Sequence, residues 1–202
     1  MSGNTFTFVP ADLDRWLLLP LTGDVDHEAA ALVFDRVGHA ASEDFLEMTT
    51  AWVAGTTRIA RRDADRLLSG SHVPTFAAWV LLPGPRLLLP GPVAFLRAGP
   101  LAADATDDDA LGAVVDLSAE LHGELEVEGV DTASGPALLV RRRPVRDLDG
   151  VRAVEEHRLA IWPRPDLEAV VSLTLYVVDL VEGGAAAEPF RELATGLRWD
   201  VT

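Results

Sequence analysis

Three residue types are missing from this chain of 202 residues, and each absence excludes a class of chemistry. There is no lysine, no cysteine and no glutamine, and Asn4 is the only asparagine. Without lysine the chain cannot form a Schiff base or build the phosphate-binding lysine of a P-loop. Without cysteine it has no thiol nucleophile, no iron–sulfur ligand and no thiolate zinc site. Because it also has no glycine-rich turn between a strand and a helix, we expect no cofactor.

Basic residues are scarce beside acidic ones. Asp and Glu number 32 against 17 basic residues, all of them arginine, which gives a formal net charge of -15 and a pI near 4.6. This balance argues against binding to nucleic acid or to an anionic membrane surface, and it suits a basic protein partner. The arginine-only composition is typical of a genome of high GC content. With 49% apolar residues the chain can bury a core, so we expect a single domain spanning residues 1–202.

Targeting and membrane signals are also scarce. The apolar run Trp16–Leu19 is too short for the hydrophobic region of a signal peptide. The longest charge-free stretch, Ser69–Pro85, contains three prolines and falls short of a membrane span. We therefore expect a cytoplasmic protein.

The first third of the chain reads as two strands followed by two helices. Thr5–Val9 and Trp16–Leu19 are candidate strands of an opening hairpin. Apolar residues at helical spacing predict a helix from Asp24 or Asp26 to Gly38, and a second one begins at Ser42 and ends near Ser69. The buried stripe expected on this second helix comprises Phe45, Met48, Trp52, Ile59 and Leu67.

The rest of the chain alternates apolar runs with turn residues, which predicts strands joined by hairpins. The expected strands are Phe76–Leu82, Arg86–Leu96, Glu124–Val130, Pro136–Arg143, Val151–Trp162 and Ala169–Val178, the last of them in the middle of the sheet. An acidic loop at Asp104–Asp109 would precede a short helix over Leu111–Leu121, and a closing helix with Pro189 in its first turn would precede a strand at Trp199. The fold class predicted is α+β, a mostly antiparallel sheet flanked by helices. The five tryptophans are dispersed, one per element, and we expect them in the core or at its rim.

One segment places a histidine and three carboxylates at alternating positions: His122, Glu124, Glu126 and Glu128. On a strand they would share a face and could offer ligands to a divalent cation. Neighbours on one face of a strand lie about 6.6–6.8 Å apart, which is too far to share an ion without help. The alternative, which we favour, is a solvated strand face whose charges discourage edge pairing.

The chain has one basic cluster, Arg141–Arg143 with Arg146. Guanidinium groups bind oxyanions in a bidentate way, so the cluster is a candidate site for a small anionic ligand. The alternative, which we favour, is that Arg141 and Arg143 pair across a hairpin with the Glu124–Glu128 strand.

Histidine supplies the remaining candidates for catalysis. His157 follows two glutamates on a predicted strand and could act as a general base held by a carboxylate, or simply lie on the wet face of the sheet. The pair Ser71-His72 lacks the Gly-x-Ser-x-Gly pattern of a nucleophile elbow, and we assign it to a loop. His27 and His39 flank a helix and are expected at the surface.

Three segments of the C-terminal part carry a resemblance to a known group of proteins. They are GPALLVRR (Gly135–Arg142), the strand AVVSLTLYVVDL, and the helix and strand PFRELATGLRWD. Together they resemble uncharacterised actinobacterial proteins with a PsbP-like α/β/α sandwich, over about a third of the chain. The resemblance implies an antiparallel sheet flanked by helices in a group that acts by binding other proteins, and it transfers no site residue.

Two hypotheses of function follow. The first is a non-enzymatic protein-interaction or accessory domain with a protein partner, which the charge suggests is basic. The second is a binder of a small anionic ligand, or an enzyme, that uses Arg141, Arg143 and His157 in a cleft at the sheet edge. A homodimer formed through the Phe76–Leu96 region is a third option.

Overall fold

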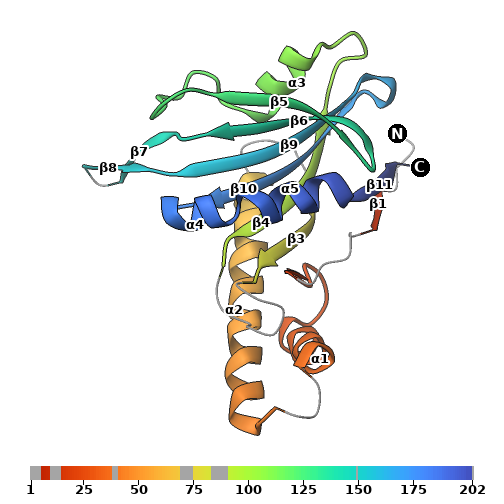
Figure 1. Ribbon diagram of the computed structural model, residues 1–202. Helices are drawn as coiled ribbons and strands as arrows, with labels where there is room; N and C mark the ends of the chain where they lie inside the picture. Colours follow the sequence, from red (N-terminus) through yellow and green to blue (C-terminus); the bar gives the residue numbers. More distant parts are fainter. Residues whose placement is uncertain are drawn as a thin grey trace.

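The computed structural model describes residues 6–9, 15–37, 41–68, 75–82, 91–148 and 150–201. Ser71-His72, His39, the side chain of Leu67 and the Arg86–Pro90 part of one predicted strand lie outside the described residues. Within them the chain forms an antiparallel sheet of seven strands and five helices (Figure 1). The predicted α+β class is therefore confirmed.

The seven-stranded sheet has the order β2-β3-β4-β10-β9-β6-β5, and each neighbouring pair is antiparallel. In that order the strands are Trp16–Leu18, Thr75–Leu81, Val93–Pro100, Ala169–Val177, Glu156–Arg164, Gly135–Arg142 and Glu126–Thr132. Strand β10 lies at the centre, as its almost wholly apolar sequence predicts. The hairpins β5–β6 and β9–β10 are also confirmed, the second across a 3-10 turn at Pro165–Leu167. The expected strand Val151–Trp162 is divided, however, because only its part from Glu156 onward belongs to this hairpin.

Helices cover both faces of this sheet, because side chains alternate between the two faces along each strand. One face, here called the α5 face, carries Trp79, Trp162 and Leu173 and packs against α5 (Ala187–Gly196), with α4 (Leu180–Ala185) just before it (Figure 1). The other, here called the α2 face, holds two separate apolar clusters. One joins β2, β3 and β4 to α1 (Val25–Val37) and α2 (Glu43–Leu68). The second joins β6, β9 and β10 to α3 (Asp107–Val114).

Two small ribbons complete the fold. Strand β1 (Phe6–Val9) pairs with β11 (Arg198–Val201), and β7 (Val145–Leu148) pairs with β8 (Val151–Val154). The predicted opening hairpin is therefore wrong, since β1 joins the end of the chain and β2 joins β3. A two-stranded ribbon this short is marginal by itself, whereas β2 buries Trp16 and Leu17 by extending the main sheet.

The predicted buried stripe of α2 is wrong in phase. Met48 and Ile59 are 63% and 51% exposed, and Phe45 and Trp52 are half-buried. Among the α2 side chains that the structure describes, the buried ones are instead Thr49, Val53, Ala54, Thr57 and Ala60. These side chains are small, so they let α2 approach the sheet and α1 closely, and packing against two neighbours decides which face is buried.

Helix α3 begins earlier than predicted, inside the segment assigned to an acidic loop. Thr106 caps it: its hydroxyl accepts from the backbone N–H of Asp109, and the Asp109 carboxylate accepts from the backbone N–H of Thr106 at 2.9 Å. This reciprocal capping box fixes the start of the helix at Asp107. The closing helix and strand agree with prediction, with Phe190, Leu193 and Trp199 buried.

The described part of the region Phe76–Leu96 lies mostly inside the fold, in β3 and β4, where Trp79 and Leu96 are fully buried. These side chains are not exposed for contact with a second copy of the chain. None of the helices in the described ranges combines the length and the apolarity that a membrane span requires.

Candidate functional site

The arginines and the histidine selected from the sequence lie on opposite faces of the sheet. Arg141 of β6 stands opposite Arg158 of β9, and Arg142 stands opposite His157. Side chains one residue apart on a strand point to opposite faces. The structure therefore brings Arg141 and Arg143 together on the α5 face and places His157 with Arg142 on the α2 face.

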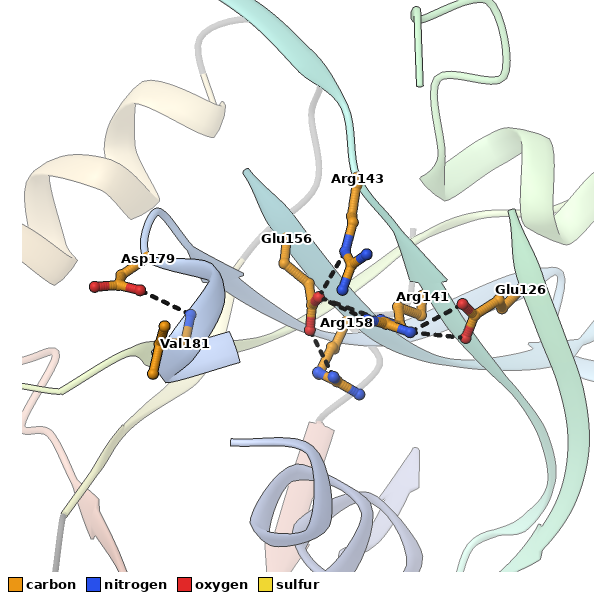
Figure 2. A network of polar contacts seen from close by, with 7 residues as sticks. All are labelled: Glu126, Arg141, Arg143, Glu156, Arg158, Asp179 and Val181. Carbon is orange, nitrogen blue, oxygen red and sulfur yellow. Dashed lines mark hydrogen bonds and ion pairs between the residues drawn. The ribbon is translucent and has the colours of Figure 1, made fainter. Parts of the chain in front are cut away.

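Arg141 and Arg143 converge on Glu156, the first residue of β9 and fully buried (Figure 2). The Nε of Arg143 donates to Glu156 Oε2 at 3.0 Å, and the Nη2 of Arg141 donates to the same oxygen at 3.1 Å. Arg158 forms an ion pair with Glu156 Oε1, with an N···O distance of 2.5 Å. Arg141 also reaches across the hairpin to Glu126 of β5 at 2.9 Å. The predicted cross-strand pairing is thus confirmed for Arg141, whereas Arg143 pairs with Glu156.

Glu156 stays ionised in this setting. Burial by itself would raise the pKa of Glu156, but the hydrogen bond from Arg143 and the charges of Arg158 and Arg141 outweigh burial and hold that pKa below its ordinary value. Burial opposes the charge of Arg141 as well, and its hydrogen bonds to Glu156 and Glu126 raise its pKa on balance. Each arginine of the network therefore has a carboxylate at ion-pair distance, and all three share Glu156.

A groove of about 320 Å³ lies beside this network, between β5, β6 and the start of α5. Its charged lining residues are Arg141, Arg158, Arg191, Glu126, Glu128 and Glu188. Arg191 forms an ion pair with Glu128 at 2.8 Å, so the acids match the bases in number and two of the arginines are already paired within the lining. The groove carries no excess positive charge, so it offers no net electrostatic attraction to an anion.

The residues proposed for a cation site do not share one strand face. Strand β5 begins at Glu126, so His122 and Glu124 lie in the segment before it. Glu126 and Glu128 form ion pairs with Arg141 and Arg191, respectively. Within the described ranges, no three His, Asp or Glu side chains lie close enough together to hold a metal ion. The solvated face that the charges suggested fits better.

A second groove, of about 500 Å³, lies where α3 begins beside the β5–β6 turn. Its lining includes Asp107 and Asp131, three prolines and the hydroxyl of Thr106, which already caps α3. Among these lining residues there is no histidine, and the one side-chain hydroxyl already caps α3. The lining therefore brings no histidine together with a free hydroxyl nucleophile.

His157 belongs to a polar strip that separates the two apolar clusters on the α2 face. The strip runs across β4, β10, β9 and β6 and consists of Arg97, Ser172, Thr174, Tyr176, His157 and Arg142. His157 Nε2 lies 2.9 Å from Glu155 Oε2. The imidazole also packs edge-on against the ring of Tyr176, with 4.6 Å between the ring centroids. Burial lowers the pKa of His157, and the hydrogen bond to Glu155 offsets this in part.

Sequence reasoning did not select Arg97 or Tyr176, although one signal was available. Arg97 lies two positions after Phe95 in an apolar run, so alternation places its charge on the same buried face as Phe95. A charged residue in phase with a buried aromatic residue breaks the pattern of the strand, and such breaks are common at functional sites.

A further feature is an apolar stripe along α2, defined here as Phe45, Met48, Trp52 and Ile59. Met48 and Ile59 are exposed, Phe45 is half-buried, and Trp52 is partly buried against the apolar cluster of α1 and α2. Residues three, four and seven apart in a helix lie on one side of it. Phe34 of α1, 42% exposed, adds a further apolar side chain to the outside of this helix pair. In Figure 1 the N-terminal half of α2 extends away from the sheet beside α1.

Comparisons with protein families, curated proteins and solved structures found no match for this chain. The function is therefore argued from the geometry of the described residues.

Proposed function

We propose that this chain is a non-enzymatic protein-binding domain, that the apolar stripe of α2 is its docking surface, and that its partner there is a basic amphipathic helix. The exposure of the stripe is the observation that carries the proposal. Met48 and Ile59 leave more than half of their surface in water, although the spacing of the stripe is that of a buried helix face. Aromatic residues and methionine are enriched in protein interfaces, and apolar side chains gathered on one exposed side mark such surfaces.

The charges of the α1–α2 pair favour a basic partner. The exposed acidic residues of the α1–α2 pair are Asp24, Asp26, Glu28, Asp35, Glu43, Asp44 and Glu47. Two nearby arginines are already occupied. Arg58 pairs with Asp26 at 2.6 Å, and Arg61 donates to the carbonyl groups of Pro20 and Gly23. An apolar stripe on an acidic helix pair is complementary to a helix with an apolar face and basic flanks.

The finer expectations from the sequence are consistent with this proposal. The resemblance to PsbP-like sandwiches implies a group that acts by binding other proteins, and it points to the same class of function. A cytoplasmic location is part of the same proposal.

A synthetic amphipathic helix of about 18 leucine and lysine residues is the probe for this surface. Isothermal titration calorimetry should show binding that weakens with added salt, because part of the attraction is electrostatic. Met48→Glu and Ile59→Glu should each weaken it by about tenfold or more, which corresponds to ~1.4 kcal/mol. Val151→Glu is the matched control, since Val151 is 67% exposed on the distant β7–β8 ribbon.

Three results would overturn the proposal. One is an absence of binding, and another is equal affinity for Met48→Glu and Val151→Glu. The third is a dimer of the chain itself, seen by light scattering and abolished by Met48→Glu, because the stripe would then be occupied by a second copy. A matching peptide of leucine and glutamate should not bind.

A further inference from the structure

Arg97 is a buried cation that has no acidic partner among the described residues. Its side chain projects from β4 into the polar strip, and the residue is 7% exposed. Its Nε donates a hydrogen bond to the hydroxyl of Thr75 at 3.3 Å, and its Nη1 donates one to the hydroxyl of Tyr176 at 3.4 Å. The guanidinium also lies over the ring of Phe95, with 5.0 Å between Cζ and the ring centroid. No carboxylate of the described residues forms an ion pair with it, and its buried Nη2 has no hydrogen-bond acceptor there.

Such a charge is expensive to bury. Removing a cation from water costs several kcal/mol unless an opposite charge and hydrogen bonds replace the lost hydration. On the α5 face the fold meets this requirement, since buried Glu156 has three guanidinium partners. On the α2 face, Arg97 has hydroxyl groups and an aromatic ring in place of a carboxylate. A negative charge supplied from outside the chain would remove the imbalance.

The groups beside Arg97 are suited to an oxyanion. Ser172 stands opposite Arg97 in the register of β4 and β10, and Thr174 stands opposite Phe95, so both hydroxyls lie on the same face. Both residues are buried. Hydroxyl donors around a guanidinium form the donor set that binds carboxylate and phosphate oxygens.

Arg142 repeats the pattern at the other side of the strip. It is 6% exposed, its Nη1 donates to the backbone carbonyl of Asp116 at 2.8 Å, and its buried Nε has no acceptor among the described residues. Burial lowers the pKa of Arg142. The strip between the two apolar clusters thus holds two buried guanidiniums, neither of which has a described carboxylate at ion-pair distance, in a chain of net charge -15.

We infer that the polar strip of the α2 face binds a small ligand bearing a carboxylate or a phosphate group, and that Arg97 forms the charge contact while Tyr176 and Ser172 donate hydrogen bonds to it. This site lies on the sheet, distinct from the docking stripe on α2, and it goes beyond the proposed protein-binding function. The acidic surface repels free anions, so binding there requires the specific donors of the strip.

Thermal unfolding tests the inference with inorganic phosphate and acetate as probes, each compared with chloride at equal ionic strength. A ligand that binds the folded state raises the Tm in proportion to the logarithm of its concentration. We expect one of the two anions to raise the Tm beyond the effect of chloride, and the one that does so identifies the ligand class. The rise should persist in Arg152→Met, which removes an exposed arginine from β8, and in Met48→Glu, which alters the stripe.

Two variants probe the strip itself. Arg97→Met should abolish the rise without lowering the Tm in anion-free buffer, because an unpaired buried charge contributes little to stability. Tyr176→Phe keeps the ring, removes the hydroxyl and should reduce the response several-fold. No specific rise in the wild type would overturn the inference. An undiminished rise in Tyr176→Phe together with a large loss of Tm in Arg97→Met would overturn it too, because it would assign Arg97 a purely structural role.

Discussion

Gly183 of α4 lies directly against the carboxylate of Glu156. A Cβ atom placed on Gly183 would stand 3.0 Å from Glu156 Oε1 and 3.1 Å from its Cδ. The absence of a side chain at this position lets the helix cover the ion cluster of Arg141, Arg143 and Arg158 and exclude water from the carboxylate. The charge network and the packing of α4 are therefore one structural unit.

Alanine substitution at Gly183 should destabilise the protein. The added methyl group would press on a carboxylate that three arginines hold in place, so neither partner can move freely. Gly184→Ala is the matched control, because a Cβ there meets nothing within 4 Å. In a helix, alanine is favoured over glycine by about 0.5–1 kcal/mol, so Gly184→Ala should be neutral or stabilising. Urea unfolding of the two variants measures the difference, and equal stabilities would show that α4 does not pack on Glu156.

Neutralising Glu156 should be far more damaging than neutralising Glu126. Glu156→Gln leaves three buried or half-buried guanidiniums without their shared carboxylate, and breaking a buried pair of this kind costs about 3–5 kcal/mol. Glu126 is 62% exposed and serves Arg141 alone, so Glu126→Gln should have a small effect. Chemical denaturation at neutral pH tests this, and similar losses for both variants would contradict the assigned roles.

Stability should fall as the pH drops below the ordinary pKa of histidine, near 6.5. Burial lowers the pKa of His157 in the folded state, so between that lowered pKa and 6.5 the unfolded chain binds more protons than the folded one. The stability contributed by neutral His157 is complete above 6.5 and is lost as the pH falls through this window. The groups facing the ring are Glu155, Tyr176, Arg142 and Arg146.

The check is the difference in unfolding free energy between pH 7.5 and a mildly acidic buffer, compared between the wild type and His157→Asn. The variant should lose less stability on acidification. If both proteins lose the same amount, the pH dependence belongs to other groups.

The local elements of this fold were predictable, and the reasons are visible in single strands. The Ser134-Gly135 turn between two runs of alternating residues predicts the β5–β6 hairpin, and the hairpin in turn pairs Arg141 with Glu126. The pairing of β1 with β11 joins opposite ends of the chain, and no local pattern encodes it. The phase of α2 was ambiguous because two of its sides carry apolar residues, one of small residues and one of large residues.

The candidate sites were harder to predict from the sequence, because each is formed by strands that are distant in the chain. Glu156 meets Arg141 through the pairing of β9 with β6, and Arg97 meets Tyr176 through the pairing of β4 with β10. Neither contact follows from spacing along one segment. On α2, the helical spacing of large apolar residues predicts burial for Met48 and Ile59, which the fold leaves exposed.

The emission of Trp52 tests the proposed docking surface most directly. Of the five tryptophans, all within the described ranges, Trp16, Trp79, Trp162 and Trp199 are buried, and Trp52 alone is partly exposed. Binding of the basic amphipathic helix should shift the emission to shorter wavelength and protect it from acrylamide, and Trp52→Phe should remove both effects. Binding that leaves the quenching of Trp52 unchanged would contradict the assignment of α2 as the docking surface.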